Sequence, residues 1–284
     1  MEEHEANGHC NYRSWCRACV AGRGRSDAHV SESSDENALP VVSIDYAYLG
    51  DPAKDGDDKA SPILVLRSSR DRWTYSEVYP AKGVQNTWCA KRLAVELAMV
   101  PWTRFTLKSD QEPAILALKT EALKCLKVLA AKEVVLEEAP VGDSQSNGLA
   151  EMAVREVKGV VRSLRWALEE LHGVKIENSS AVLPWLVRHA GSMISRTRRG
   201  ADGRTAFELR KGRGYKRRLP PFGEKVLYLE AGKLRSQLQD RWHEGIFLGL
   251  QDRSDEVLVG IREGCSRRAL CGASTACSGG TPSS

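Results

Sequence analysis

Hydrophobic and polar positions along the chain follow two periods, which separate predicted strands from predicted helices. Apolar or alternating runs predict β-strands at residues 39–50, 61–70, 72–81, 103–108, 133–139, 224–231, 244–250 and 256–261. Apolar positions three and four apart predict helices at residues 84–100, 112–130, 147–172 and 182–196. Three strands come in succession and further strands then alternate with helices, which predicts an α/β core. The last three strands are short and could form a small barrel.

Composition limits the class of protein. With 284 residues and 42% apolar side chains, the chain can bury a real core. No apolar run reaches the length of about 20 residues that a membrane span needs, and the N-terminus lacks a signal-peptide pattern, so we expect an intracellular protein. Eight cysteines over this length are too sparse for a disulfide framework and favour metal binding or plain burial.

Positive charge is concentrated in one segment, which we call the basic block. It holds ten cations against Asp202 and Glu208, namely Arg196, Arg198, Arg199, Arg204, Arg210, Lys211, Arg213, Lys216, Arg217 and Arg218. Such a block indicates a polyanionic partner, and nucleic acid is the obvious one. The alternative is an ordinary solvated surface.

Three carboxylates occupy positions where metal binding would explain them. Asp45 lies inside an apolar strand, where an ionised group is costly unless it meets a positive charge. Asp110 follows the predicted strand 103–108, which can lie beside the first strand, and Glu151 lies in the first turn of the long helix. Carboxylates that converge in this way repel one another unless divalent cations separate them, and all-oxygen ligands favour Mg²⁺ or Mn²⁺.

The long helix is predicted to have two unlike faces. At about 100° per residue, Glu151 shares a stripe about 80° wide with four cations, Arg155, Lys158, Arg162 and Arg165. Apolar side chains gather on the opposite side, at Leu149, Ala153, Val157, Val160, Leu164, Ala167 and Leu171. A helix that laid DNA phosphates across a metal site would show this pattern, although an amphipathic surface helix with a basic outer face would show it too.

These residues together resemble a known family. The in-strand Asp45, the "SD" that ends in Asp110 and the string "SQSNGLAEMAVREVK" around Glu151 are similar to the acidic triad of retroviral and retrotransposon integrase cores. The resemblance implies an RNase H-like fold, a mixed five-stranded sheet with flanking helices. It also implies that Asp45, Asp110 and Glu151 are catalytic residues that hold two Mg²⁺ or Mn²⁺ ions.

The same resemblance implies the chemistry and the partners. An integrase processes DNA 3′ ends and transfers the strand to target DNA, usually as an oligomer, and in a eukaryote it acts in the nucleus. DNA contacts would come from the helix and from the basic block, at Asn147, Arg155, Lys158, Arg162, Lys216, Arg217 and Arg218. A cysteine–histidine nucleophilic enzyme is disfavoured, because no histidine lies near Cys89 or Cys125 in the sequence.

Later segments are similar to copia-type retrotransposon polyproteins. The strings "PFGEKVLYL" and "EGIFLGL" carry this likeness, so we expect a fragment of a longer Pol polyprotein. The expected organisation is a His/Cys segment, a linker, the core, a basic linker, a small β domain and a disordered tail, at residues 1–24, 25–38, 39–195, 196–220, 221–264 and 265–284. An alternative function is an inactive nucleic-acid-binding remnant of a decayed or co-opted retroelement.

The N-terminus holds a second candidate site. His4 and His9, followed by Cys16 and Cys19, have the spacing His-x4-His and Cys-x2-Cys and can supply four zinc ligands. They follow the order of the zinc module in the family that the chain resembles, although His9 and Cys16 are closer than is usual there. Cys10 and His29 are further ligand candidates. The alternative is a disordered leader in which the cysteines share no role.

Overall fold

The computed structural model describes residues 2–23, 38–50, 61–139, 147–229, 241–261 and 264–270. Within these residues a five-stranded sheet has the order β3-β2-β1-β4-β5, formed by Thr74–Val78, Ile63–Ser68, Val41–Ala47, Arg104–Ser109 and Glu133–Glu138. The strands β1, β2 and β3 are antiparallel neighbours, whereas β4 pairs parallel to both β1 and β5. A mixed five-stranded sheet with flanking helices is the fold expected of an RNase H-like core, so this expectation is confirmed.

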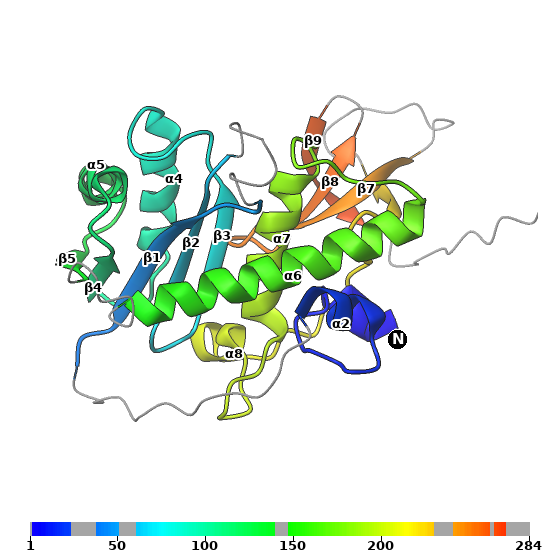
Figure 1. Ribbon diagram of the computed structural model, residues 1–284, viewed down its shortest axis with the longest axis horizontal. Helices are drawn as coiled ribbons and strands as arrows, with labels where there is room; N and C mark the ends of the chain where they lie inside the picture. The colour runs from blue at the N-terminus through cyan, green and yellow to red at the C-terminus, as the bar shows by residue number, and fades with distance from the viewer. Residues whose placement is uncertain are drawn as a thin grey trace, which may run out of the picture.

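Helices cover both faces of the sheet (Figure 1). Successive side chains of a strand point to opposite faces, so β1 sends Val42 and Ile44 into one core with α4 (Thr87–Ala98) and α5 (Pro113–Leu129). On the other face, Ile63 and Val65 of β2 join the core formed with α6 (Gly148–His172) and α7 (Leu183–Thr197). Asp45 lies between Ile44 and Tyr46, which belong to the α4 and α5 side, so the strand period directs it to the α6 side.

The sequence pattern explains the bounds of α6. Its apolar stripe is buried as predicted at Ala153, Val157 and Val160. The helix ends where Gly173 adopts a left-handed conformation with φ of 65°, a value that glycine reaches without a steric penalty. Leu171 was expected in the core, but its side chain is 62% exposed, because the last turn of α6 extends past its packing partners.

A closed barrel follows the core. Its strands are β6 (Lys225–Leu229), β7 (Trp242–Leu250), β8 (Val257–Ile261) and β9 (Gly264–Leu270), and pairing of β6 with β9 completes the closure. Three of these strands were predicted. The fourth corrects the expectation of a disordered tail from residue 265, because residues 264–268 pair with β8 and residues 269–270 pair with β6. Residues 271–284 lie outside the described residues.

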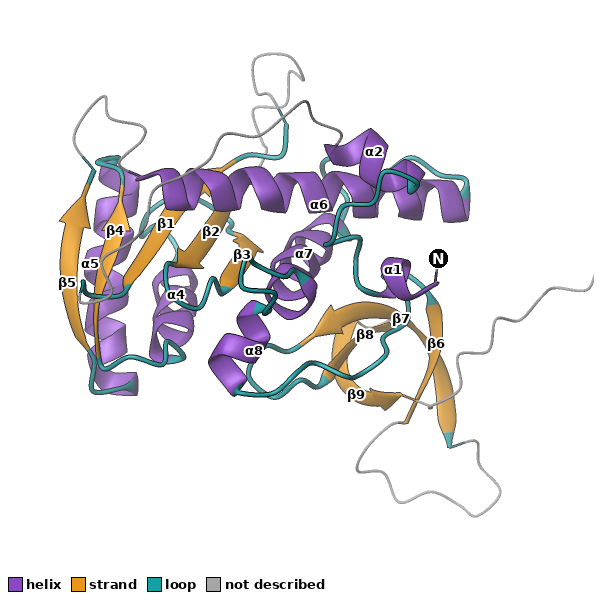
Figure 2. Cartoon of the chain, turned by 90° about the horizontal axis from the view of Figure 1, so that it is seen from below, coloured by secondary structure: helices purple, strands orange, loops and turns teal. Residues whose placement is uncertain are grey.

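The barrel and the core share a hydrophobic interior. Phe247 and Val259 of the barrel belong to the same buried cluster as Leu186 and Ala190 of α7, and Figure 2 shows the barrel beside α7. The short helix α8 (Ala206–Lys211) lies within the segment expected to be a linker. It begins with a capping box, in which Thr205 accepts from the backbone N–H of Glu208 and the Glu208 side chain accepts from that of Thr205.

Two further helices lie at the N-terminus, α1 (Glu2–Ala6) and α2 (Arg17–Arg23). Figure 1 shows α2 beside α6, towards the carboxyl end of that long helix. Among the described residues, no helix combines the length and the apolar character that crossing a bilayer requires.

Candidate carboxylate and zinc sites on one helix

The first two carboxylates meet because β1 and β4 are parallel. The pairing of the two strands ends with Ser43 opposite Lys108. Asp45 lies two residues further along β1, and Asp110 lies two residues beyond Lys108, just after the last residue of β4. Because parallel strands carry their residues in step, this register sets the two side chains next to each other. The expectation that the first and fourth strands are neighbours is therefore confirmed.

The third carboxylate comes from the start of α6. Glu151 lies in the first turn of this helix, which packs across β1 and β2. The amino end of α6 lies near β4, at one side of the sheet (Figure 1). A buried ion pair fixes the helix one turn further on, where Glu156 accepts from the guanidinium of Arg67 on β2 at 2.5 Å. The rotation of α6 that presents Glu151 is thus set by packing and by charge.

The three groups interact through their charges. Burial, together with the negative charges of Asp110, Glu151 and Glu112, raises the pKa of Asp45 to about 6, against the opposing effect of a backbone hydrogen bond from Tyr46. A carboxyl group whose ionised form is disfavoured by burial and by like charges is a site that a cation would stabilise. The three carboxylates do not, however, gather as tightly as the His/Cys group described below, which is the compact metal-ligand group among the described residues.

Two charged residues beside these carboxylates were missed by the sequence interpretation. Glu112 stands two residues after Asp110 and its backbone N–H donates to Asp110 Oδ1 at 3.3 Å. Lys82, from the segment between β3 and α4, donates to both carboxylate oxygens of Glu112 at 2.7 and 2.9 Å. The string "SDQE" shows the nearby acid, but no local pattern reveals that a lysine 30 positions earlier reaches it.

The cations of α6 have different surroundings. Arg155 is exposed, whereas Lys158 is half-buried, and burial and the nearby Arg162 lower its pKa while the charge of Asp45 opposes this shift. Arg162 is exposed but donates to the carbonyl oxygen of Gly22 at 2.9 Å. Arg165 serves the fold, because its Nε pairs with Glu169 at 3.0 Å and its NH1 donates to Asn178. The predicted stripe is therefore open to solvent next to Glu151 and is covered by α2 further along.

Asn147 stands immediately before α6. Its side chain is only 5% exposed, and its Oδ1 has no hydrogen-bond partner among the described residues. It makes no side-chain cap for the helix. Its predicted contact with DNA stays a prediction.

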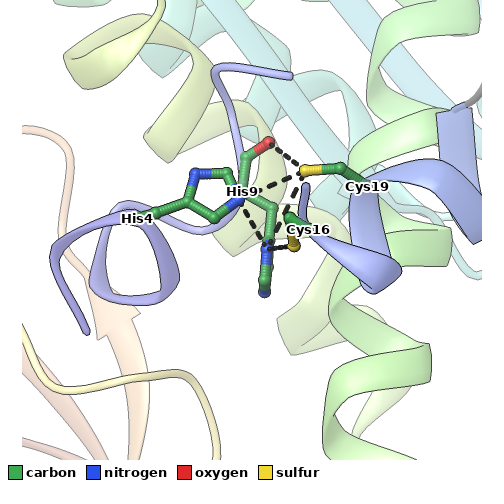
Figure 3. A group of neighbouring side chains, drawn as sticks. All are labelled: His4, His9, Cys16 and Cys19. Carbon is green, nitrogen blue, oxygen red and sulfur yellow. Dashed lines mark hydrogen bonds between the residues drawn. The ribbon is translucent and has the colours of Figure 1, made fainter. Parts of the chain in front are cut away.

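The N-terminal His/Cys group converges as its spacing predicted (Figure 3). One ligand atom from each of His4, His9, Cys16 and Cys19 lies within 4.8 Å of all the others. The histidine nitrogens are 3.2 Å apart, and each thiol has a histidine nitrogen at 3.4 or 3.3 Å. Tetrahedral zinc, with bonds of about 2.0 Å to nitrogen and about 2.3 Å to sulfur, implies edges of roughly 3.3 to 3.8 Å between ligands.

The surroundings of this group suit a metal ion. Burial lowers the pKa of His4, and burial together with His4 and Arg23 lowers the pKa of His9 to about 4, so both imidazoles are neutral at pH 7. Arg23 also donates to Cys19 Sγ at 3.5 Å, which places a cation beside a sulfur that would bind as thiolate. Cys10 does not belong to the four converging residues, and burial raises the pKa of its thiol to about 12. His29, the other spare candidate, lies outside the described residues.

The segment that carries the His/Cys group packs on α6 at close range. A Cβ on Gly22 would lie 2.4 Å from Ser163 Oγ, and a Cβ on Gly159 would lie 2.6 Å from Arg23 Cγ. Asn11 ties the same segment to α7 by donating to the carbonyl oxygen of Thr197 at 3.0 Å. One helix therefore carries Glu151 at its start and supports the His/Cys segment along its second half.

The basic block divides into internal and external cations. Arg196 is 2% exposed and pairs with Asp252 at 3.0 Å and Asp255 at 2.6 Å in the turn between β7 and β8. Arg210 pairs with Asp71 at 2.6 Å, also away from solvent. These two cations of the basic block are therefore not available to a polyanionic partner, because the fold uses their charge internally.

The remaining cations of the block are more accessible. Lys216, Arg217 and Arg218 are exposed, although Arg217 also donates to the carbonyl oxygen of Asp255 at 3.0 Å. A hollow of about 350 Å³ nearby is lined by alternating cations, acids and glycines, at Arg199, Asp202, Gly203, Arg204, Glu208, Gly212, Arg213 and Gly214. An exposed basic surface thus survives after the buried cations are removed from the block.

Comparisons with known proteins were made for the whole chain. No protein-family model and no curated protein sequence matches it. Among solved structures, the chain is similar to the catalytic core domain of BIV integrase, with 17% identity and a TM-score of 0.38 over 61% of this chain and 93% of that one. It is also similar to a chain of a simian T-cell lymphotropic virus intasome in complex with PP2A regulatory subunit B56 gamma. That match has 13% identity and a TM-score of 0.39, and covers 81% of each chain.

These structural neighbours are retroviral integrases. Because both TM-scores lie below 0.5, the fold class rests on the strand order and pairing of the chain itself.

Proposed function

We propose that the chain is a retrotransposon integrase, a polynucleotidyl transferase that processes DNA 3′ ends and joins them to target DNA. The observation that carries the proposal is the placement of Asp45 and Asp110 in step on adjacent parallel strands, with Glu151 at the start of the helix that crosses them. The raised pKa of Asp45 supports it, since burial and the neighbouring carboxylates prepare the group for a cation.

Asp45, Asp110 and Glu151 would hold two divalent ions, Mg²⁺ or Mn²⁺. These ions, when bound, supply the activation of a water or a 3′-hydroxyl for in-line attack on a phosphodiester. The carboxylates also set the charge of the site, because as free anions they repel phosphate. Arg155 and Lys158, one and two turns beyond Glu151, would offset that repulsion and orient the DNA backbone.

The proposal extends to the origin and partners of the chain. The sequence likeness around "PFGEKVLYL" and "EGIFLGL" supports a copia-type element and a piece of a Pol polyprotein. Joining two donor ends to a target requires several active sites, so we expect a homo-oligomer on DNA. In a eukaryotic cell its place of action would be the nucleus.

Replacement of Asp110 by Asn tests the active site. Asp110→Asn should abolish Mg²⁺-dependent nicking of a labelled duplex and leave DNA affinity nearly unchanged, because it removes a metal ligand and no phosphate contact. The matched control is Glu170→Gln, near the other end of α6, where the carboxylate is exposed and faces Arg17 at 3.7 Å. Nicking at the wild-type rate by Asp110→Asn would refute the triad.

The rival function, a DNA-binding remnant without activity, is separated by the same assay. If the chain is a remnant, the wild-type protein should bind DNA but should not nick it in Mg²⁺ or Mn²⁺. Strand transfer in either metal would exclude it.

The exposed end of the basic block is proposed as a phosphate-binding surface. Each phosphate contact contributes about 0.9 to the slope of log affinity against log salt on duplex DNA. Replacing Lys216, Arg217 and Arg218 by Gln should therefore flatten the slope by roughly two to three units and weaken all sequences alike. A wild-type slope in the triple variant would show that these cations are only part of a solvated surface and do not contact phosphate.

We further propose zinc as the ion of the His/Cys group. Four neutral or thiolate ligands at tetrahedral separations are the donor set of structural zinc sites. Protein purified without chelator should contain about one zinc per chain, measured by elemental analysis. A content far below one would count against the assignment.

A further inference from the structure

A segment between β3 and α4 lies against the carboxyl end of β1. The backbone N–H of Gly83 donates to the hydroxyl of Tyr46, the residue after Asp45, at 3.0 Å. Gly83 adopts φ of 74° and approaches Ala114 at the start of α5. The segment is thereby held between β1, which carries Asp45, and the start of α5, which closely follows Asp110.

Lys82 is the charged residue that this segment delivers. Its ammonium donates to both oxygens of Glu112 and lies 5.4 and 5.3 Å from the ring centres of Tyr46 and Tyr48. The side chains of Lys82 and Glu112 are 28% and 31% exposed, so solvent reaches the pair. The cation therefore stands at the rim of the carboxylate site, on a surface that a ligand can approach.

Glu112 adds a fourth negative charge to this site. It acts on Asp45 through its charge and hydrogen-bonds Asp110 through its backbone, while Lys82 in turn feels the charge of Asp110. An ion pair with this much exposure contributes little to stability. Lys82 can therefore leave Glu112 and pair with another anion at little cost to the stability of the fold.

We propose that Lys82 binds a DNA phosphate beside the scissile bond, and that Glu112 competes with the DNA for its ammonium. The inference rests on the proposed function and adds a contact that approaches the carboxylates from the β3–α4 segment, whereas Arg155 and Lys158 approach from α6. Phosphate is the expected partner because a lysine ammonium on a flexible stem binds it as a point charge.

Substitutions of the two members of the pair should change DNA affinity in opposite directions. Lys82→Met should weaken binding of a fluorescein-labelled duplex roughly threefold to tenfold and flatten its salt slope by about one contact. Glu112→Gln should strengthen binding, because it releases Lys82 from its competitor. The gain in affinity from Glu112→Gln should be much smaller in the Lys82→Met background than in the wild type, because the competition for the ammonium is then gone. Binding is measured by fluorescence anisotropy on the full chain without Mg²⁺ or Mn²⁺, and melting temperatures verify that each variant is folded.

A control pair on α5 separates this effect from a change in net charge. Lys124 and Glu121 pair at 2.8 Å with exposures of 68% and 40%. Lys124→Met and Glu121→Gln remove the same two kinds of charge from a different pair. They should change DNA affinity by much less than the Lys82 and Glu112 variants do.

Each outcome decides between the possibilities. If Lys82→Met and Glu112→Gln shift affinity in the same direction, or no further than the control pair, Lys82 only holds its segment in place and the inference fails. A wild-type chain that binds no duplex refutes the proposed function, and this inference with it. Wild-type binding with an unchanged Lys82→Met variant refutes the inference alone.

Discussion

Replacing Asp45 by Asn should inactivate the site and at the same time stabilise the metal-free protein. Burial and the charges of Asp110 and Glu151 raise the pKa of Asp45 from 3.8 to about 6. A rise of about two pH units corresponds to about 3 kcal/mol that the ionised carboxylate costs the folded state. The amide of Asn carries no charge and avoids this cost.

The sign follows from proton linkage. The folded state holds its proton up to about pH 6, whereas the unfolded chain loses it near pH 4, so wild-type stability falls as pH rises through this window. The advantage of Asp45→Asn should be full above pH 6 and should vanish below about pH 4. For a protein of this size, about 3 kcal/mol raises the melting temperature by roughly 6 to 12 °C.

Thermal unfolding at pH 8, 6 and 4 measures the effect, in buffer without Mg²⁺ or Mn²⁺. No chelator is added, because it would also remove a metal from the His/Cys group. Adding Mg²⁺ should stabilise the wild type and not the variant. Asp202→Asn is the control, since a hydrogen bond from Arg72 lowers the pKa of Asp202 and its loss should give no stabilisation. If Asp45→Asn melts at or below the wild-type temperature at pH 8, the electrostatic reasoning is wrong.

Three other substitutions test the zinc ligands, a buried ion pair and the packing on α6. Cys19→Ser should reduce bound zinc to well below one per chain, as measured by elemental analysis. Arg196→Met should destabilise the protein by about 3 to 5 kcal/mol in chemical denaturation, because it leaves Asp252 buried without a partner. Gly22→Val should detach the N-terminal segment from α6, since a Cβ there meets Ser163 at 2.4 Å. Faster amide exchange confined to residues 7–23 would show it, and unchanged exchange would contradict the packing.

The sequence pattern was sufficient for the elements and for the parts of each site that local spacing encodes. Alternation and helical period identified the core strands and α6, and the His-x4-His and Cys-x2-Cys spacing identified a group that converges within 4.8 Å. Spacing succeeds there because the ligands are few residues apart and the backbone between them is short.

Long-range charge pairing was beyond the reach of the sequence. Arg196 looked like part of a solvated block, yet its partner Asp252 follows 56 residues later, in the turn between β7 and β8 of the barrel. The strand β9 was missed for a similar reason. Its sequence lacks an apolar run, with Ser266, Arg267 and Arg268 at its centre, and pairing with β8 and closure of the barrel against β6 determine its structure.

The double duty of α6 restricts how this chain can vary in evolution. Glu151 and the Gly159 contact with Arg23 lie on one rigid helix, so deletion of a single residue between them would turn one relative to the other by about 100° and shift them by about 1.5 Å. Substitutions on the outer surface of the helix preserve the relative rotation and spacing of Glu151 and Gly159, whereas insertions and deletions in its first three turns do not. Lineages of this chain should therefore tolerate length changes in α6 poorly even where its side chains diverge.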